Sequence, residues 1–344
     1  MTSIALELQQ TIAAMAVRGK GILAADESSN TIAKRFADIG VESTEEARCR
    51  YRSLLLATPH LGDFISGVIL FEETLAQTAC VNNVAIPQLA AIQQIVPGIK
   101  VDKGLTDLAN CPGEQVTQGL DGLRERLTEY KKLGARFAKW RNVYHISSRT
   151  PSRRAININA EMLARYAALC QEQGIVPIVE LEVLINGTHS IENCAEATEV
   201  TIQALFHALH RQGVVLEHCI LKPNMVVPGK DSGIETTPEQ VAELTLKVLR
   251  RTVPAAVPMI AFLSGGLSPA DSDAYLNAIN QQPAPWLLSY SYGRALQQEA
   301  LHVWSGKQEN WDEAQAALHH RARLTAAAQL GDYRADMEHV SSHD

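Results

Sequence analysis

Eight short apolar segments alternate with longer stretches whose apolar residues recur at helical spacing. Of all the features of the sequence, this alternation limits the possible folds most. Strands that alternate with helices form parallel sheets, because each return to the sheet needs a crossover. Eight such units favour an α/β fold closed into a (β/α)8 TIM barrel over an open doubly wound sheet. The predicted strands are residues 21–27, 67–73, 99–103, 137–144, 175–184, 219–225, 259–265 and 287–293.

The predicted helices have recognisable ends. Ser268 and Thr237 each stand directly before a proline, which is typical of a capping residue followed by the first helical turn. Glycines stand where three helices should end, at Gly134, Gly174 and Gly213. The helical segments between the strands are residues 44–57, 120–133, 160–173, 192–212, 238–251 and 268–281.

The length of 344 residues fits one barrel of about 250 residues with extensions. We therefore expect a single domain over residues 1–329. It would begin with an amphipathic helix at residues 6–17, which lacks the basic start of a targeting peptide. Residues 330–344 are polar and have no apolar periodicity, so they predict a flexible C-terminal tail.

Charge and composition disfavour several classes of protein. A net charge of −7 argues against nucleic-acid binding, because neutralising phosphates needs a basic surface. The apolar stretches fall far below the roughly 18 residues that span a membrane. None of the six cysteines stands at zinc-type spacing, so buried structural thiols are the simpler interpretation. Scattered thiols without a secretory signal predict a cytoplasmic protein.

Ionisable residues stand within or just after most of the predicted strands. Buried parallel strands are normally continuous apolar runs, so one such residue could be a solvated strand end or a buried ion pair. Charges on most of the eight strands instead indicate an active site, which barrels build at the C-terminal ends of their strands. The residues are Asp26, Glu72, Glu73, Lys103, Lys139, Arg141, Glu180, Glu182, Lys222 and Arg294.

Lys222 has the position of a nucleophile. Pro223 follows it and cannot donate to a central ladder, so Lys222 is expected near the end of its strand. Burial and a second cation such as Lys139 would lower the pKa of its amine. The neutral amine can attack a ketone, and the resulting iminium weakens the adjacent carbon–carbon bond. Glu180 and Glu182 share one face of a strand and can move the protons.

The last two strands predict an anion site. Ser264, Gly265 and Gly266 follow the seventh strand and expose backbone N–H groups, while Gly293 and Arg294 follow the eighth. Barrels often bind phosphate at this place. A pair of glycines usually marks only a turn, but its position beside a cation favours phosphate binding.

Six segments together resemble the class I fructose-1,6-bisphosphate aldolases, and they occur in that family's order. The resemblance covers roughly residues 15 to 310, almost the whole predicted barrel. The segments are LAADES at 23–28, KVDKG at 100–104, FAKWR at 137–141, LKPNM at 221–225, FLSGG at 262–266 and SYGRAL at 291–296.

The resemblance implies a role for each matching residue. Lys222 matches the Schiff-base lysine, and Glu180 matches the group that dehydrates the carbinolamine, with Lys139 and Glu182 beside it. Asp26 matches the group that handles the proton of the C4 hydroxyl. The residues implied for the C1 phosphate are Ser264, Gly265, Gly266, Ser291, Gly293 and Arg294, with Arg35 nearby. Those implied for the C6 phosphate are Ser28, Thr31 and Lys103. Arg141 is also implied to bind the substrate.

The resemblance also implies phosphorylated sugar substrates, no metal or other cofactor, and a homotetramer. Thr31 stands where animal members have serine, which keeps the hydroxyl. Animal members end in a tyrosine that takes part in proton exchange, whereas this chain ends in Ser341, Ser342, His343 and Asp344. Tyr333 or His343 could carry that proton, but an inert tail is the simpler expectation.

Two alternatives remain beside the bisphosphate lyase. A transaldolase or one-phosphate aldolase would share the Schiff base, but predicted anion sites at both ends of the cleft argue against it. A non-catalytic protein could have kept the fold, but the presence of Lys222, Glu180 and Asp26 argues against loss of activity. Glu72 and Glu73 are expected to pair with neighbouring lysines rather than to take part in catalysis.

Overall fold

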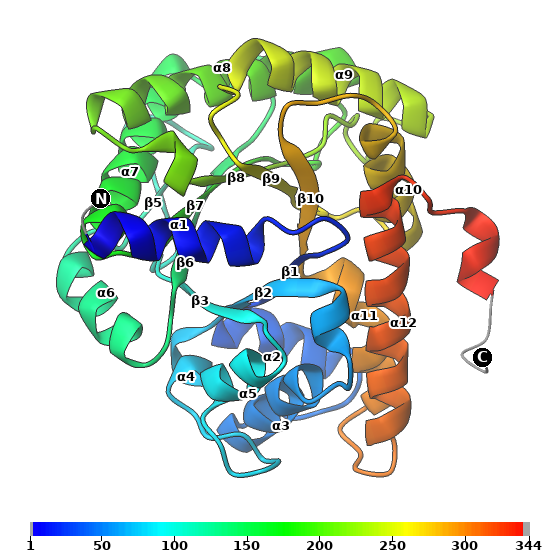
Figure 1. The fold of residues 1–344 in the computed structure, drawn as a ribbon. Coiled ribbons are helices and arrows are strands. Elements are labelled where there is room, and N and C mark those ends of the chain that lie inside the picture. Colours follow the sequence, from blue (N-terminus) through cyan, green and yellow to red (C-terminus); the bar gives the residue numbers. More distant parts are fainter. Residues whose placement is uncertain (1–2, 340–344) are drawn as a thin grey trace.

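A computed structural model describes residues 3–339, and its centre is a closed barrel of eight parallel strands (Figure 1). The predicted (β/α)8 fold is therefore confirmed. β1 pairs with both β2 and β10, which closes the sheet. The order around the barrel is β1 (Gly21–Ala25), β2 (Ile65–Leu70), β3 (Val96–Lys100), β6 (Phe137–Tyr144), β7 (Val176–Val183), β8 (Ile220–Pro223), β9 (Met259–Phe262) and β10 (Leu287–Tyr292).

Helices surround the barrel, and their capping residues fix where they start. The predicted caps are confirmed: Thr237 accepts from the backbone of Gln240, and Ser268 accepts from that of Asp271. The helices are α2 (Ser29–Ala37), α3 (Glu45–Leu56), α4 (Glu72–Leu75), α5 (Ile86–Ile92), α6 (Leu123–Lys132), α7 (Arg153–Glu172), α8 (Ile191–Arg211), α9 (Pro238–Thr252), α10 (Pro269–Asn280), α11 (Arg294–Trp304) and α12 (Trp311–Leu330).

Several boundaries differ from the sequence-based prediction. The third barrel strand ends at Lys100, three residues earlier than predicted, so Lys103 lies in the loop beyond it. α7 begins at Arg153 rather than near residue 160, because Ser152 caps it by accepting from the backbone of Ala155. Patterns too short for periodicity were missed, namely α2, α4, α5 and the hairpin of β4 (Leu105–Asp107) and β5 (Gln115–Thr117).

One end of the barrel is filled with apolar side chains. The N-terminal helix α1 (Ser3–Met15) lies across this end, as Figure 1 shows, and buries Leu8, Ile12 and Met15 against the barrel interior. The Phe137 ring fills the space beside Gly98, where an added Cβ would lie 2.3 Å from the ring. A substrate can therefore reach the interior only from the opposite end, where the strands have their C-termini.

The C-terminal segment is predicted to be a flexible tail, but it is folded up to His339. The 3-10 helix η3 (Ala335–His339) follows α12, and its Glu338 pairs with Arg321 at 2.6 Å. Tyr333 is 8% exposed, and its hydroxyl donates to Glu338 at 2.8 Å. This part is thus docked on the barrel by burial and an ion pair. Residues 340–344, including His343, lie outside the described part of the chain.

Candidate active site

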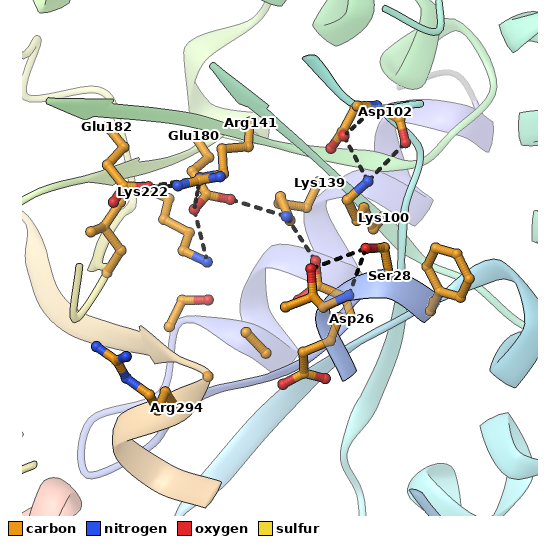
Figure 2. A pocket seen from close by; sticks show the side chains of 18 of the residues that line it. Asp26, Ser28, Lys100, Asp102, Lys139, Arg141, Glu180, Glu182, Lys222 and Arg294 are labelled. Carbon is orange, nitrogen blue, oxygen red and sulfur yellow. Dashed lines mark hydrogen bonds and ion pairs between the residues drawn. The ribbon is translucent and has the colours of Figure 1, made fainter. Parts of the chain in front are cut away.

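The C-terminal ends of the barrel strands surround a cavity of about 840 Å³ (Figure 2). It is lined by strand ends, by the loops that follow them, by residues at both ends of α2 and by the first turn of α11. The structure brings every predicted site residue to this cavity, namely Asp26, Ser28, Thr31, Arg35, Lys103, Lys139, Arg141, Glu180, Glu182, Lys222, Ser264, Gly265, Gly266, Ser291, Gly293 and Arg294.

Lys222 lies next to Glu180 across neighbouring strands. The two residues are partners in the register of β7 and β8, and Lys222 Nζ lies 3.3 Å from Glu180 Oε1. Lys222 is only 4% exposed. Burial lowers the pKa of its amine, the nearby Lys139 lowers it further, and Glu180 opposes the change without cancelling it. The amine is therefore neutral at lower pH than an ordinary lysine.

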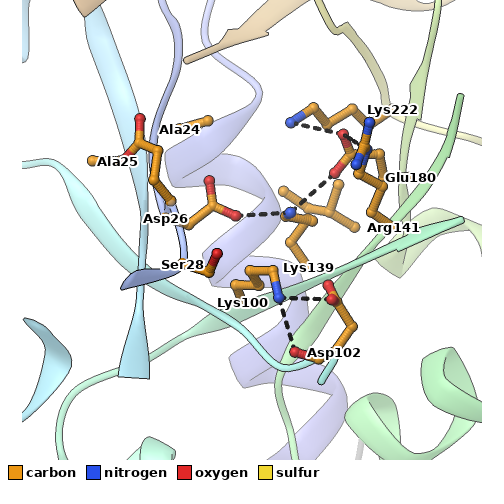
Figure 3. A network of polar contacts seen from close by, with 12 residues as sticks. Ala24, Ala25, Asp26, Ser28, Lys100, Asp102, Lys139, Arg141, Glu180 and Lys222 are labelled. Atoms are coloured by element: carbon orange, nitrogen blue, oxygen red, sulfur yellow. Dashed lines mark hydrogen bonds and ion pairs between the residues drawn. The ribbon is translucent and has the colours of Figure 1, made fainter. Parts of the chain in front are cut away.

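Lys139 lies between two carboxylates (Figure 3). Its Nζ is 2.7 Å from Asp26 Oδ2 and 3.2 Å from Glu180 Oε2. Burial disfavours the ammonium form, but Asp26 and Glu180 outweigh burial and raise the pKa of Lys139 above its ordinary value. The cavity thus holds two buried lysines with opposite shifts, and Lys139 supplies a permanent positive charge.

Asp26 follows β1 directly and is ionised. Burial alone would raise its pKa, but Lys139, Lys222 and Lys100 together lower the pKa to about 2. Burial also raises the pKa of Glu180, and again the surrounding cations, with Lys139 first, bring the pKa below its ordinary value. Both carboxylates are therefore ionised near neutral pH.

Arg141 and Glu182 form a second charged pair at the cavity wall. Arg141 Nε donates to Glu182 Oε2 at 2.7 Å. Burial would lower the pKa of Arg141, but Glu182 and Glu180 raise it. Since Arg141 remains charged, it can orient Glu182 or meet an anionic substrate.

Lys100 and Asp102 are functional candidates that the sequence-based prediction missed. Both line the cavity, and Lys100 Nζ lies 2.6 Å from Asp102 Oδ1. The predicted strand covers residues 99–103, which puts Lys100 near its start and Lys103 at its end. The two-residue spacing of Lys100 and Asp102, which puts both on one side of an extended chain, is the signal that could have found them.

The loops after β9 and β10 meet at the cavity, where an anion site is predicted. Gly265 has φ 47°, and an added Cβ would lie 2.7 Å from a Leu263 methyl carbon, so this position favours glycine. The buried hydroxyl of Ser291 has no hydrogen-bond partner in the described part of the chain. Arg294 is exposed at the start of α11, and none of residues 3–339 forms an ion pair with it. A hydroxyl and a cation are thus available to a ligand.

A different set of groups lies at the start of α2. Ser28 caps this helix by accepting from the backbone of Thr31, and their hydroxyl oxygens lie 3.0 Å apart. Lys103 Nζ lies 2.6 Å from Glu72 Oε2, as expected for a structural Glu72. In the view of Figure 2, Arg294 and Lys100 lie on opposite sides of the cavity. Cationic and hydroxyl side chains therefore lie on both sides of the cavity.

Two expected side chains are already paired within the protein. Arg35 lines the cavity, but its guanidinium lies 2.5 Å from Glu27, which also pairs with the buried Arg52. Glu73 pairs with Arg48 rather than with a lysine. Between residues 3 and 339, no group of three or more His, Cys, Asp or Glu could hold a metal ion. Over the same range, no helix is long and apolar enough to cross a membrane.

The mouth of the barrel holds a buried amine with a lowered pKa. Ionised carboxylates and cationic side chains surround this amine. Such a site is typical of enzymes that use a lysine to act on phosphorylated carbonyl compounds. Comparison with known proteins then gives the family. The sequence model described as fructose-bisphosphate aldolase class-I matches residues 7–344. The chain therefore belongs to the class I fructose-bisphosphate aldolase family, which confirms the resemblance seen in the sequence.

Individual relatives agree. A probable fructose-bisphosphate aldolase class 1 of Xylella fastidiosa is 54% identical over 95% of this chain and 98% of its own length. The cytosolic fructose-bisphosphate aldolase 4 of Arabidopsis thaliana is 51% identical over 96% of this chain and 85% of its own length. A solved fructose-bisphosphate aldolase of Plasmodium falciparum, in complex with TRAP and an inhibitor, is 48% identical, with a TM-score of 0.95 and 97% of each chain covered. The function is accordingly that of a class I aldolase, a lyase.

Proposed function

We propose that Lys222 is the amine through which this aldolase forms its Schiff base with the ketone carbon of fructose 1,6-bisphosphate. The observation that carries the proposal is the buried Lys222 amine, 3.3 Å from Glu180 and with a lowered pKa. Lys139, the other buried lysine of the cavity, has a raised pKa and is a poor nucleophile.

The neighbouring groups suit the proton transfers of such a reaction. Attack by Lys222 gives a carbinolamine, and Glu180, once it has taken up the proton lost by the amine, returns a proton to the departing hydroxyl so that water leaves. The iminium then withdraws electrons from the C3–C4 bond. Asp26 accepts the proton of the C4 hydroxyl as that bond breaks, which releases glyceraldehyde 3-phosphate. Protonation of the remaining enamine and hydrolysis release dihydroxyacetone phosphate and restore the Lys222 amine.

The two anion-binding ends of the cavity supply the substrate's orientation. The side chains of Arg294 and Ser291 would hold the C1 phosphate. Backbone groups of the two adjoining loops would complete this site, at Ser264, Gly265, Gly266 and Gly293. Ser28, Thr31 and Lys103 would hold the C6 phosphate. Arg35 would lie near the C1 phosphate, and Arg141 would also bind the substrate. Within residues 3–339, Arg294 forms no ion pair and the Ser291 hydroxyl has no hydrogen-bond partner, which supports this assignment.

Finer properties are proposals as well. The class I family acts without a metal, and the described residues contain no metal-binding group, so we propose that the enzyme needs no cofactor. Relatives named cytosolic or cytoplasmic support a cytoplasmic location. We propose a homotetramer because the family resemblance implies one. The division into a barrel domain at 1–329 and a tail at 330–344 also stays a prediction.

Reductive trapping tests the nucleophile directly. Borohydride added with dihydroxyacetone phosphate should inactivate the enzyme and add one triose phosphate to the peptide that contains Lys222. The Lys222→Arg variant should fold, bind substrate and trap nothing, and chelators should leave wild-type activity unchanged. An adduct on Lys100, Lys103 or Lys139, or loss of activity with EDTA, would overturn the proposal.

A further inference from the structure

Two of the six cysteines face each other at the surface, away from the cavity. Cys49 lies on α3 and is half-buried, while Cys80 lies in the loop between α4 and α5 and is exposed. Their Sγ atoms are 3.6 Å apart. Both are free thiols, and the other four cysteines are buried. The sequence-based prediction of buried structural thiols is therefore wrong for this pair.

The backbone around Cys80 is attached to the helix that carries Cys49. The Cys80 N–H donates to the hydroxyl of Ser53, one turn along α3 from Cys49, at 3.0 Å. The Cys49 thiol donates to the carbonyl of Thr78 at 3.3 Å. Thr78 also forms a bridge with Ala85, which closes the neck of the loop. Little conformational entropy remains to be lost when the sulfur atoms approach to about 2.05 Å.

The two thiols differ in how a reagent can reach them. Cys80 is exposed and accessible to a small disulfide. Burial is the largest of the causes that raise the pKa of Cys49 to about 11, and the hydrogen bond and charge of Cys80 contribute to the same rise. Once Cys80 is in a mixed disulfide, it has neither a thiol proton nor an ionisable group, so its contributions to the raised pKa of Cys49 disappear. Cys80 is therefore suited to react first and Cys49 second.

We propose that Cys49 and Cys80 form a reversible dithiol–disulfide site whose oxidant is a low-molecular-weight disulfide. The Cys80 thiolate attacks one sulfur of the reagent, forms a mixed disulfide and releases one thiol. The Cys49 thiolate then attacks Cys80 Sγ and expels the second thiol. Both protein thiol protons pass to the released thiolates, so one reagent disulfide is reduced for each protein disulfide formed.

The bond would tie the cavity rim to α3. It closes a ring over residues 49–80, which contains β2 and α4. Glu73 of α4 already pairs with Arg48, the residue before Cys49, and Glu72 holds Lys103 at the cavity. Because the ring restricts the unfolded chain, oxidation should stabilise the protein against unfolding. Neither thiol lines the cavity, so kcat should stay unchanged.

Oxidised glutathione provides the test, with the full-length reduced protein. Non-reducing peptide mapping should find Cys49 linked to Cys80, and the thermal unfolding midpoint should rise by roughly 2–4 °C or more, returning on reduction. Cys49→Ser should stop at a stable glutathione adduct on Cys80, while Cys80→Ser should take up no glutathione on Cys49. A stable adduct on wild-type Cys80, no reaction at Cys80, or linkage of either thiol to another cysteine would each overturn the proposal.

Discussion

The Lys222 amine and the Glu180 carboxylate lie 3.3 Å apart, on paired positions of β7 and β8. The register of the sheet fixes this distance, so it does not depend on a mobile loop. Glu180 raises the pKa of Lys222 while burial lowers it. The Glu180 carboxylate therefore has two effects. It is a proton acceptor, and it limits how far burial lowers the pKa of the Lys222 amine.

Replacing Glu180 with glutamine separates these two effects. We expect kcat for cleavage of fructose 1,6-bisphosphate to fall by about 10²–10⁴, the usual worth of a general acid–base group. Removal of the negative charge should also lower the pKa of Lys222 further, because Glu180 raises it in the wild type. The pH profile for acylation of Lys222 should then move to lower pH. An unchanged or alkaline-shifted profile would contradict the assigned contact.

The two ends of the cavity should differ in substrate preference. Arg294→Ala should reduce kcat/KM for both fructose 1,6-bisphosphate and fructose 1-phosphate, because each carries the C1 phosphate. A lost charged hydrogen bond of about 1.5–3 kcal/mol corresponds to a fall of roughly 10- to 150-fold. Lys103→Ala should affect mainly the bisphosphate. Equal losses on both substrates in both variants would refute the arrangement.

Glu72 should compete with the substrate for Lys103. The two side chains pair at 2.6 Å but are 46% and 47% exposed, so the pair contributes little stability. Glu72→Gln would release the lysine and remove a negative charge, and KM for the bisphosphate should fall by about two- to fivefold at unchanged kcat. Glu73→Gln is the matched control, since Glu73 pairs with Arg48 and does not line the cavity. A higher KM in Glu72→Gln would show that the pair positions Lys103 for the phosphate.

Two truncations separate the structural and catalytic roles of the C-terminal segment. Ending the chain after Gly331 removes the buried Tyr333 and leaves Arg321 without Glu338, so the free energy of unfolding should fall by about 2–4 kcal/mol. Ending it after His339 keeps Tyr333 and the pair of Arg321 with Glu338, so this variant is the matched control in urea denaturation.

Proton exchange at C3 of dihydroxyacetone phosphate should change less than about threefold in both truncations if the segment is catalytically inert. A fall of tenfold or more, with borohydride trapping unimpaired, would show that it carries a proton. A loss confined to the longer truncation would point to Tyr333, and a loss in both would point to residues 340–344.

Strand and helix periodicity was sufficient to predict the barrel and the elements that carry Lys222, Glu180 and Lys139. It placed the third strand's end at Lys103 because the charged run from Lys100 has no apolar periodicity to mark a boundary. The pairing of Arg35 with Glu27 and Arg52 was not predictable, since it joins residues from separate elements. The docking of Tyr333 depends in the same way on a distant partner, Asn277, which accepts from its backbone.

The contact that closes the barrel has a consequence for how the chain is made. The Ser289 hydroxyl donates to the carbonyl of Lys20, 269 residues earlier, and Gln297 donates to the carbonyl of Ala24. A ribosome makes the first strand long before these partners exist. Until β10 emerges, β1 keeps one unpaired edge, a state that favours aggregation and engages chaperones. The last quarter of translation therefore decides whether the nascent barrel closes on itself or on another chain.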